Sequence, residues 1–423
     1  MKKNLAIILV LLMVSLTFVA CGNSKTFEYS LNEDGNGYTL VSIGKNNTMS
    51  EIVIESEYKG LPVTTIGRNA FEGCENIISV IIPNSVEKIE GNAFKDCSSL
   101  KSISIPDSVS EIGAGAFAKC ESLADITLPS GIDKIYANTF VNCKSIVEIT
   151  IPDGVESIGE HAFYGCQSLS EITISEGVTA IKTNAFAKCT SLKNVTVPKS
   201  VTELDVTAFS ECSELTTLTL NCKGIQSSMF ADFKKLETVV IGDGVDYIGR
   251  TAFKGCTALK SVTIDNSVTS IGDYAFSGCT SLSSISIGEG IKHIGEYILN
   301  NTAYANDETK WEDGVLYIGK YLLDVNNNMP EAYTVKAGTK LIAMKAFASS
   351  KLKKIIIADS VERICEYAFE SCHDLSYAEF QNKEGWSMTN RQPSEILPET
   401  LAKTESNAHL LRIIGSSGKM IRE

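Results

Sequence analysis

The sequence predicts a solenoid, a rod of stacked coils that share one core. The main observation is a phenylalanine that recurs every 23 residues, at Phe71, Phe94, Phe117, Phe140, Phe163, Phe186 and Phe209. After one shorter step of 21 residues, the spacing returns at Phe230, Phe253 and Phe276. A fixed period of roughly 20–50 residues indicates a repeat architecture. Stacked repeats share a continuous core, so the 423 residues do not require several domains.

Each repeat contains the pattern of a short strand followed by turns. The segment 100–105 alternates apolar and polar residues, so Ile103 and Ile105 share one face of a strand. A proline ends this strand in several repeats, where its missing N–H does no harm. Phe117 and Cys120 are spaced one helical turn apart, so both can face inward. The repeat therefore predicts mostly short parallel β-strands with short helical turns.

Ten of the 13 cysteines occupy one position in the repeat, three residues after the phenylalanine or its equivalent. They are Cys74, Cys97, Cys120, Cys143, Cys166, Cys189, Cys212, Cys256, Cys279 and Cys372. Free cysteine packs as a small apolar residue and is among the most buried types. Disulfides between coils and a metal-binding ladder are the alternatives. Parallel stacked side chains suit neither disulfide geometry nor tetrahedral coordination, so we predict buried thiols.

The first residues have the pattern of a secretory leader. Lys2 and Lys3 precede an apolar run over 5–19, which is short for a membrane span of about 20 residues. The run ends in Ala20-Cys21-Gly22, which resembles a bacterial lipobox. We predict a lipoprotein signal peptide at 1–20, lipidation of Cys21 and a tether at 21–26. The alternative is an ordinary secretory signal with an incidental cysteine.

The remaining chain divides into two caps and a solenoid. Residues 27–60 are predicted as an N-terminal cap, because two alternating segments flank a turn-rich link at 32–37 and indicate a hairpin. Residues 61–380 form the predicted solenoid. An irregular insert near 300–330 breaks the period, and its segment 311–323 reads as a hairpin with a turn near Gly319. Residues 381–423 are predicted as a C-terminal cap or tail, with a helix from Pro398 to about Ile413.

The repeat Ile-Gly-x-x-Ala-Phe-x-x-Cys-x-x-Leu-x-x-Ile-x-Ile-Pro resembles the 23-residue leucine-rich repeats of the BspA-like family of bacterial surface proteins. The stretches 61–67 and 311–319 are also similar to that family. The resemblance implies a leucine-rich-repeat solenoid. It also implies a role in adhesion to host matrix proteins or to other bacteria, with no catalytic motif.

Charge and motif content argue against several functions. The formal net charge is −13, and loss of Lys2 and Lys3 with the leader would bring it to about −15. Such a chain repels nucleic acid and anionic lipid headgroups. The four histidines, His161, His293, His373 and His409, fall in different coils or in the tail without metal-ligand spacing. We therefore predict no enzyme activity, no cofactor and no metal.

The outward strand positions are the predicted binding surface. Hydroxyl side chains recur at the middle position, and acidic side chains precede them in three consecutive coils. The candidate ligand-binding residues are Asp125, Thr127, Glu148, Thr150, Glu171 and Thr173. Solenoids bind through such extended faces, although Thr and Ser also suit any exposed strand. The insert at 300–330 is the alternative location, because insertions often carry function.

The predicted protein is a monomeric, lipid-anchored binding protein of a bacterial cell surface. Its partner would be a host or microbial surface protein or a glycan, and its only membrane contact would be the lipid anchor. The alternative function is an accessory binding module of an extracellular carbohydrate-processing or transport system.

Overall fold

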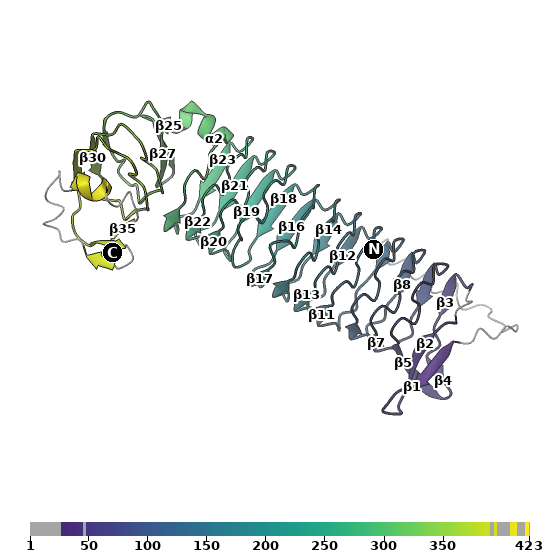
Figure 1. Cartoon of the computed structure of the whole chain (residues 1–423). Helices are drawn as coiled ribbons and strands as arrows, with labels where there is room; N and C mark the ends of the chain where they lie inside the picture. Colours follow the sequence, from purple (N-terminus) through teal and green to yellow (C-terminus); the bar gives the residue numbers. More distant parts are fainter. Residues whose placement is uncertain (1–26, 45–47, 390–392, 396–406, 413–418, 423) are drawn as a thin grey trace, which may run out of the picture.

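The computed structural model is an elongated rod of stacked coils with a smaller group of coils at its C-terminal end (Figure 1). It describes residues 27–44, 48–389, 393–395, 407–412 and 419–422. The predicted signal peptide at 1–20, the lipidation residue Cys21 and the tether at 21–26 lie outside the described residues. Within the described ranges, no helix is long and apolar enough to cross a membrane.

The N-terminal cap contains the predicted hairpin. Strands β1 (Glu28–Leu31) and β2 (Tyr38–Ser42) pair in antiparallel fashion. Strand β2 then runs parallel to β5 (Leu61–Ile66), which also pairs with β4 (Glu57–Tyr58). Strand β3 (Glu51–Val53) runs parallel to the first strand of the rod. The cap thus extends the two strand ladders of the solenoid at their open end.

Most regular coils contribute one strand to each of two separate parallel ladders, the long-strand series and the short-strand series. The long-strand series comprises β6 (Ser79–Ile81), β8 (Ser102–Ser104), β10 (Asp125–Ile126), β12 (Glu148–Thr150), β14 (Glu171–Thr173), β16 (Asn194–Val197), β18 (Thr217–Leu220), β19 (Thr238–Ile241), β21 (Ser261–Ile264) and β23 (Ser284–Ile287). The short-strand series comprises β7 (Lys88–Ile89), β9 (Glu111–Ile112), β11 (Lys134–Ile135), β13 (Ser157–Ile158), β15 (Ala180–Ile181), β17 (Glu203–Leu204), β20 (Tyr247–Ile248), β22 (Ser270–Ile271) and β24 (His293–Ile294).

The turn around each repeat phenylalanine is tighter than a helix. The Cys97 N–H donates to the Phe94 carbonyl at 3.2 Å, a bond that closes a four-residue turn. Asn92 and Asp96 on either side have φ values of 57° and 60°, in the left-handed region. A helix cannot continue through such residues, because helical backbone needs negative φ. The predicted helical turns are therefore separate hydrogen-bonded turns, although they place phenylalanine and cysteine inward as expected.

The core is a stack of identical residues from successive coils. From Phe71 to Phe209 the neighbouring phenylalanine rings lie 4.6–5.5 Å apart, centroid to centroid, in near-parallel planes. The step from Phe209 to Phe230 widens to 6.5 Å, where the coil is two residues shorter. The repeat cysteines lie beside this stack as free thiols, and all but the half-buried Cys74 are buried. No single coil could bury these side chains alone.

Within the described residues, both ladders are interrupted at the same two places. The short-strand ladder is also interrupted between β17 and β20, where an isolated bridge joins Ile225 to Ile248. Strand β9 does not pair with β11, nor β10 with β12, although the turn bonds between these coils persist, such as Phe117 N–H to Thr139 O at 2.9 Å. The second interruption follows β23 and β24, where the regular rod meets the C-terminal coils. We call this second place the junction.

Beyond the junction, the insert begins with α2 (Ala303–Asn306) and the 3₁₀ turn η1 (Glu308–Lys310). The Thr302 hydroxyl caps α2 by accepting from the Ala305 N–H at 3.1 Å. Strands β25 (Trp311–Glu312), β26 (Val315–Ile318) and β27 (Tyr321–Val325) then form an antiparallel meander. This confirms the hairpin predicted near Gly319. Because Leu316 and Leu322 are buried in the core, the insert serves as an additional coil.

The last coils continue both ladders and end in a cap. Their strands are β28 (Ala332–Thr334), β29 (Leu341–Ile342), β30 (Lys354–Ile357), β31 (Arg363–Ile364) and β32 (Tyr377–Phe380), followed by β33 (Trp386–Thr389), β34 (Pro393–Glu395) and β35 (Lys419–Arg422). Strand β35 pairs antiparallel with both β31 and β33. The predicted helix is seen at 407–412, and its predicted start at Pro398 lies outside the described residues. The three strands of this cap were not predicted from the sequence.

Candidate binding surfaces

The predicted binding residues lie on the exposed face of the long-strand series. Glu148 and Thr150 of β12 stand directly beside Glu171 and Thr173 of β14 in parallel register. All four side chains are exposed, whereas Ile149 between them is buried. The alternation of a strand places these residues, because successive side chains point to opposite faces. The structure therefore forms the predicted group of two carboxylates and two hydroxyls.

Asp125 belongs to a different sheet, and Thr127 directly follows its strand. Asp125 lies in β10, opposite Ser102 of β8, and both Asp125 and Thr127 are exposed. Since β10 and β12 do not pair within the described residues, these two residues end one sheet while Glu148 begins the next. The predicted ladder of six residues is thus one group of four plus a separate pair.

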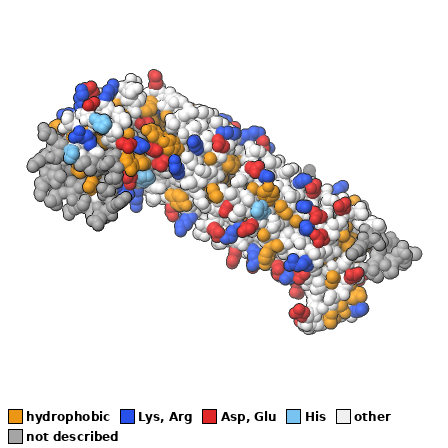
Figure 2. All heavy atoms as spheres, in the orientation of Figure 1, with side chains coloured by type: hydrophobic (Ala, Val, Ile, Leu, Met, Phe, Trp, Pro, Cys, Tyr) orange, Lys and Arg blue, Asp and Glu red, His pale blue; other side chains and the backbone are white. Residues whose placement is uncertain are grey.

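The face carries like charges at one end and mostly hydroxyls along the rest, with Asn194 and Val240 as exceptions. Glu148 and Glu171 are adjacent carboxylates, an arrangement that disfavours another anion and favours a cationic partner. Further along, Thr217 of β18 pairs with Thr238 of β19, and Ser261 of β21 with Ser284 of β23. Charged side chains of both signs are spread along the visible side of the rod (Figure 2). The face offers electrostatic selectivity near β12 and neutral hydrogen bonding beyond it.

The four histidines do not converge. His161 lies on a turn, where its Nε2 is 3.2 Å from the Asn184 side-chain amide. His293 lies in β24, His373 is exposed in the last regular turn, and His409 is exposed in the short C-terminal helix. They belong to four separate parts of the chain, as the sequence predicts.

A groove at the junction is the second candidate surface. Two adjoining hollows share Ala305, Asn306 and Trp311 in their walls. Tyr297 and Asp324 line the first hollow, and Asn326 lines the second. The Trp311 indole N–H donates to the Ala305 carbonyl at 2.8 Å, which fixes the ring beside the groove. An aromatic ring with several amides and a carboxyl can bind a ligand that has both apolar and hydroxyl-bearing faces.

Asp324 is the charged group of this groove. Its Oδ1 accepts a hydrogen bond from the Val325 N–H at 2.8 Å. Burial of the carboxyl, which disfavours its charged form, raises the pKa of Asp324 to about 6. No salt bridge to Asp324 is found among the described residues. The groove therefore holds a carboxyl that a ligand could engage by hydrogen bonds or by a positive charge.

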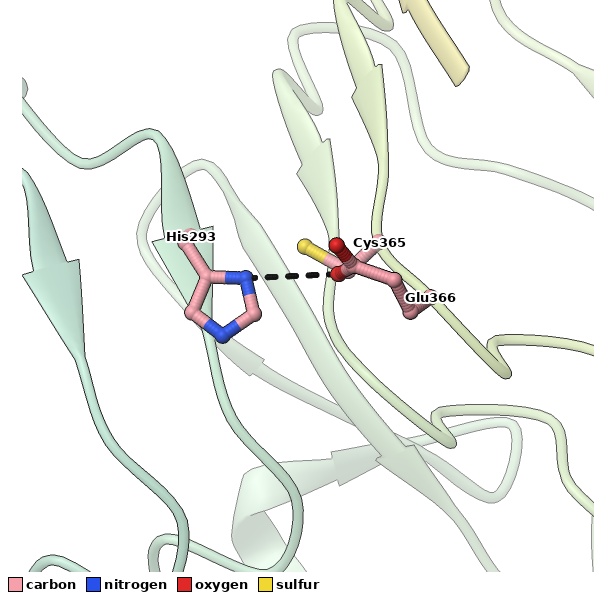
Figure 3. A group of neighbouring side chains, drawn as sticks. All are labelled: His293, Cys365 and Glu366. Carbon is pink, nitrogen blue, oxygen red and sulfur yellow. Dashed lines mark ion pairs between the residues drawn. The ribbon is translucent and has the colours of Figure 1, made fainter. Parts of the chain in front are cut away.

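Three potential metal ligands also meet at the junction. The Nδ1 of His293 lies 3.5 Å from the Oε2 of Glu366, and the Sγ of Cys365 completes a group whose ligand atoms all lie within 4.8 Å of one another. Figure 3 shows the Cys365 sulfur and the Glu366 carboxylate pointing toward His293 from the segment that follows β31. Cys365 is buried, and the other two side chains are partly exposed. These three donors could hold a cation.

Neither junction feature was identified from the sequence. His293 and Cys365 lie on opposite sides of the insert at 300–330, so no ligand spacing is visible along the chain. The local signal was that Cys365, like Cys222, lies outside the repeat position shared by ten of the cysteines. The interruption of the period at 300–330 marked the segment that contains much of the groove, but not the side chains that line it.

The repeat also defines the similarity to known proteins. A family model described as BspA type leucine rich repeat region matches residues 45–153, 133–260 and 246–376. A solved leucine rich cell surface protein from Faecalibacterium prausnitzii A2-165 is 28% identical and covers 88% of this chain and 97% of that chain, with a TM-score of 0.48. A leucine-rich repeat protein from Bacteroides ovatus ATCC 8483 is 23% identical and covers 86% and 94%, with a TM-score of 0.50. A search of curated proteins gave no match.

Proposed function

Because the chain belongs to the BspA-type leucine-rich repeat family, we propose that it is a non-catalytic binding protein of a bacterial cell surface. Its proposed ligand is a protein or glycan of a host or another microbe. The predicted secretory leader supports an extracellular role. The proposed mechanism is many weak contacts along one rigid face, since solenoids commonly bind through extended surfaces.

The observation that carries this proposal is the uninterrupted ladder from β12 to β23. Seven parallel strands hold their outward side chains in register, as in the pairs Thr196–Thr219 and Thr263–Ser286. Backbone hydrogen bonds between coils fix these side chains before a ligand arrives. Preorganisation of this kind lowers the entropic cost of binding, so even short polar side chains contribute.

Binding to arrays of matrix proteins, glycans and bacterial cells tests the proposal. We expect the combined change Glu148→Gln, Thr150→Ala and Glu171→Gln to weaken binding by about 10-fold, the effect of losing one or two good contacts. The matched control is Ser261→Ala, Thr263→Ala and Ser284→Ala on the same sheet. Unchanged binding by the first variant, with both variants folded, would refute binding at the acidic end of the face.

The junction groove favours a second candidate function, that of an accessory binding module of a carbohydrate-processing or transport system. Trp311 offers an aromatic face, and Asn306, Asn326 and Asp324 offer polar groups beside it. The change Asp324→Asn keeps the shape of the side chain and removes its charge. If glycans bind here, this variant loses glycan affinity while the strand-face variant keeps it; equal affinities for both variants would argue against the groove.

We also propose that Cys21 is lipidated and anchors the chain to the membrane. Two or more acyl chains on one cysteine would provide stable attachment. Metabolic labelling with a palmitate analogue should label the wild-type chain and not Cys21→Ala. Equal labelling of both would support the ordinary secretory signal instead.

A further inference from the structure

The donor set at the junction is chemically mixed. It combines an imidazole nitrogen from His293, a thiol from Cys365 and a carboxylate from Glu366. Nitrogen, sulfur and oxygen ligands together suit a borderline-soft divalent ion such as Zn²⁺, whereas Ca²⁺ and Mg²⁺ prefer oxygen alone. The chemistry of the group therefore selects for a transition-type metal.

The spacing of the donors fits a tetrahedral ion better than a direct contact. The 3.5 Å between His293 Nδ1 and Glu366 Oε2 exceeds the usual length of an N–H···O hydrogen bond, about 2.7–3.2 Å. Two ligands bonded to one tetrahedral Zn²⁺ at about 2.0–2.2 Å are separated by about 3.3–3.6 Å. The sulfur lies within 4.8 Å of both partners, so a movement of about 1 Å would complete the geometry.

The backbones that carry the donors are held by separate parts of the fold. His293 pairs with Ser270 of β22, in the last regular coils of the rod. The Cys365 N–H donates to the Ile342 carbonyl at 2.9 Å, in the C-terminal coils. Direct bonds between the two parts include Met344 N–H to Ile294 O at 3.0 Å. An ion at this point would connect two parts whose strand ladders do not pair.

The surrounding charges leave one carboxylate oxygen available to a metal. Lys419 Nζ lies 3.8 Å from Glu366 Oε1, on the other oxygen of the same carboxylate. Lys345 is engaged by Glu296 at 2.7 Å and by Glu370 at 3.5 Å. The Glu366 Oε2 is buried and has no hydrogen-bond partner among the described residues, apart from its weak ion pair with His293. A buried acceptor without a hydrogen bond is costly, and a cation would compensate for it.

We propose that His293, Cys365 and Glu366 form a Zn²⁺ site that links the regular rod to the C-terminal coils. The three side chains supply the protein ligands, and a water molecule takes the fourth position. On binding, the Cys365 thiol loses its proton to solvent and coordinates as thiolate. The ion acts as a structural cross-link, so its loss loosens the junction without unfolding the rod.

Titration of the full chain with Co²⁺ and Zn²⁺, after treatment with a chelator, tests this site. One equivalent of Co²⁺ should produce a thiolate-to-cobalt charge-transfer band, which one equivalent of Zn²⁺ abolishes. The change Cys365→Ser should remove the band, and His293→Ala and Glu366→Gln should weaken Zn²⁺ binding by at least about 10-fold. The matched control is Cys222→Ser, which alters a buried thiol of an earlier coil and should behave as wild type.

Hydrogen exchange with and without Zn²⁺ provides the second measurement. Zn²⁺ should slow exchange around 293–296 and 363–367 in the wild type and in Cys222→Ser, but not in Cys365→Ser. Ca²⁺ serves as the probe for adventitious carboxylate binding and should have no such effect. Binding that is weaker than stoichiometric, insensitive to Cys365→Ser or equally strong with Ca²⁺ would overturn the proposal and leave only the ion pair between His293 and Glu366.

Discussion

At the scale of the residue, the repeat cysteine stabilises the core in two ways: its side chain fills space, and its thiol donates a hydrogen bond. The Cys166 Sγ lies 3.2 Å from the Phe140 carbonyl of the preceding coil and donates to it. The same bond recurs in the neighbouring coils, as from Cys143 to Phe117 at 3.1 Å. An alanine at this position would lack both the volume of the sulfur atom and the S–H donor. The thiol is thus a packing residue whose weak donor helps to join consecutive coils.

We predict that Cys166 is inert in the folded protein and contributes to its stability. Burial raises the pKa of the Cys166 thiol to about 12, so almost no thiolate forms near pH 8. Alkylating reagents should label the half-buried Cys74 first and Cys166 only on unfolding. Cys166→Ala should lower the free energy of unfolding by about 1–2 kcal/mol in a denaturant titration. Equal labelling rates for both cysteines would contradict this view of the core.

Asp324 should make stability fall as the pH rises. Its pKa is about 6 in the folded chain and near 4 when unfolded, so the folded state binds the proton more tightly between these values. The tighter binding of this proton stabilises the folded state fully below about pH 4, and this contribution is lost as the pH rises through about 6. Asp324→Asn should therefore stabilise the chain at pH 7 by about 1–3 kcal/mol, with little effect at pH 4. Thermal melts at the two pH values measure this, and equal gains at both would exclude burial of the charge as the cause.

At the scale of the element, local sequence patterns predicted the features that depend on residues adjacent in the chain, namely strand faces and hairpins. The alternation around Ile103 gave the strand faces, and the turn residues gave both hairpins, because these depend on neighbours along the chain. The acidic group was predicted by assuming that every coil pairs with the next. That assumption fails for Asp125, since β10 and β12 do not pair. The pairing of Arg363 with Ile421 could not be predicted either, because it joins a repeat strand to a tail segment that lacks the repeat pattern.

The interruption between β9 and β11 should be a site of local opening. Around β13, the Glu156 and Gly159 N–H groups donate to Asp133 and Ile135 carbonyls, each at 2.8 Å. Equivalent strand pairing from β11 back to β9 is missing in the described residues. Amides without ladder bonds exchange through small local motions, so the peptide 132–136 should exchange faster than the equivalent peptide 155–159. Hydrogen-exchange mass spectrometry compares the two, and equal protection would mean that the ladder is continuous in solution.

At the scale of the whole molecule, the open ends of the ladders determine solubility. A rod of parallel strands exposes unpaired backbone at each end, which can add strands from another molecule. At the N-terminal end, β1 and β2 cover the first coils. At the C-terminal end, β33 and β35 pair antiparallel with each other, and β35 covers β31. Because the last strand runs antiparallel, the parallel repeat ends there. A second copy of the chain therefore cannot add its own coil as the next parallel strand.

Trp386 should hold this C-terminal cap in place. Its side chain is buried, packs edge to face on Phe380 with ring centroids 5.3 Å apart, and donates from its indole N–H to the Asn382 carbonyl at 3.0 Å. Trp386→Ala removes a large buried side chain, a loss of about 3–5 kcal/mol. Because repeats interact mainly with their neighbours, the damage should stay at this end and leave the rod folded. The freed β31 edge should then pair with a second copy. Light scattering would detect this as concentration-dependent dimers, while circular dichroism stays close to wild type. Trp386→Phe, which keeps most of the apolar contact, should remain monomeric; a monomeric Trp386→Ala variant with a native melting curve would show that the cap does not depend on this residue.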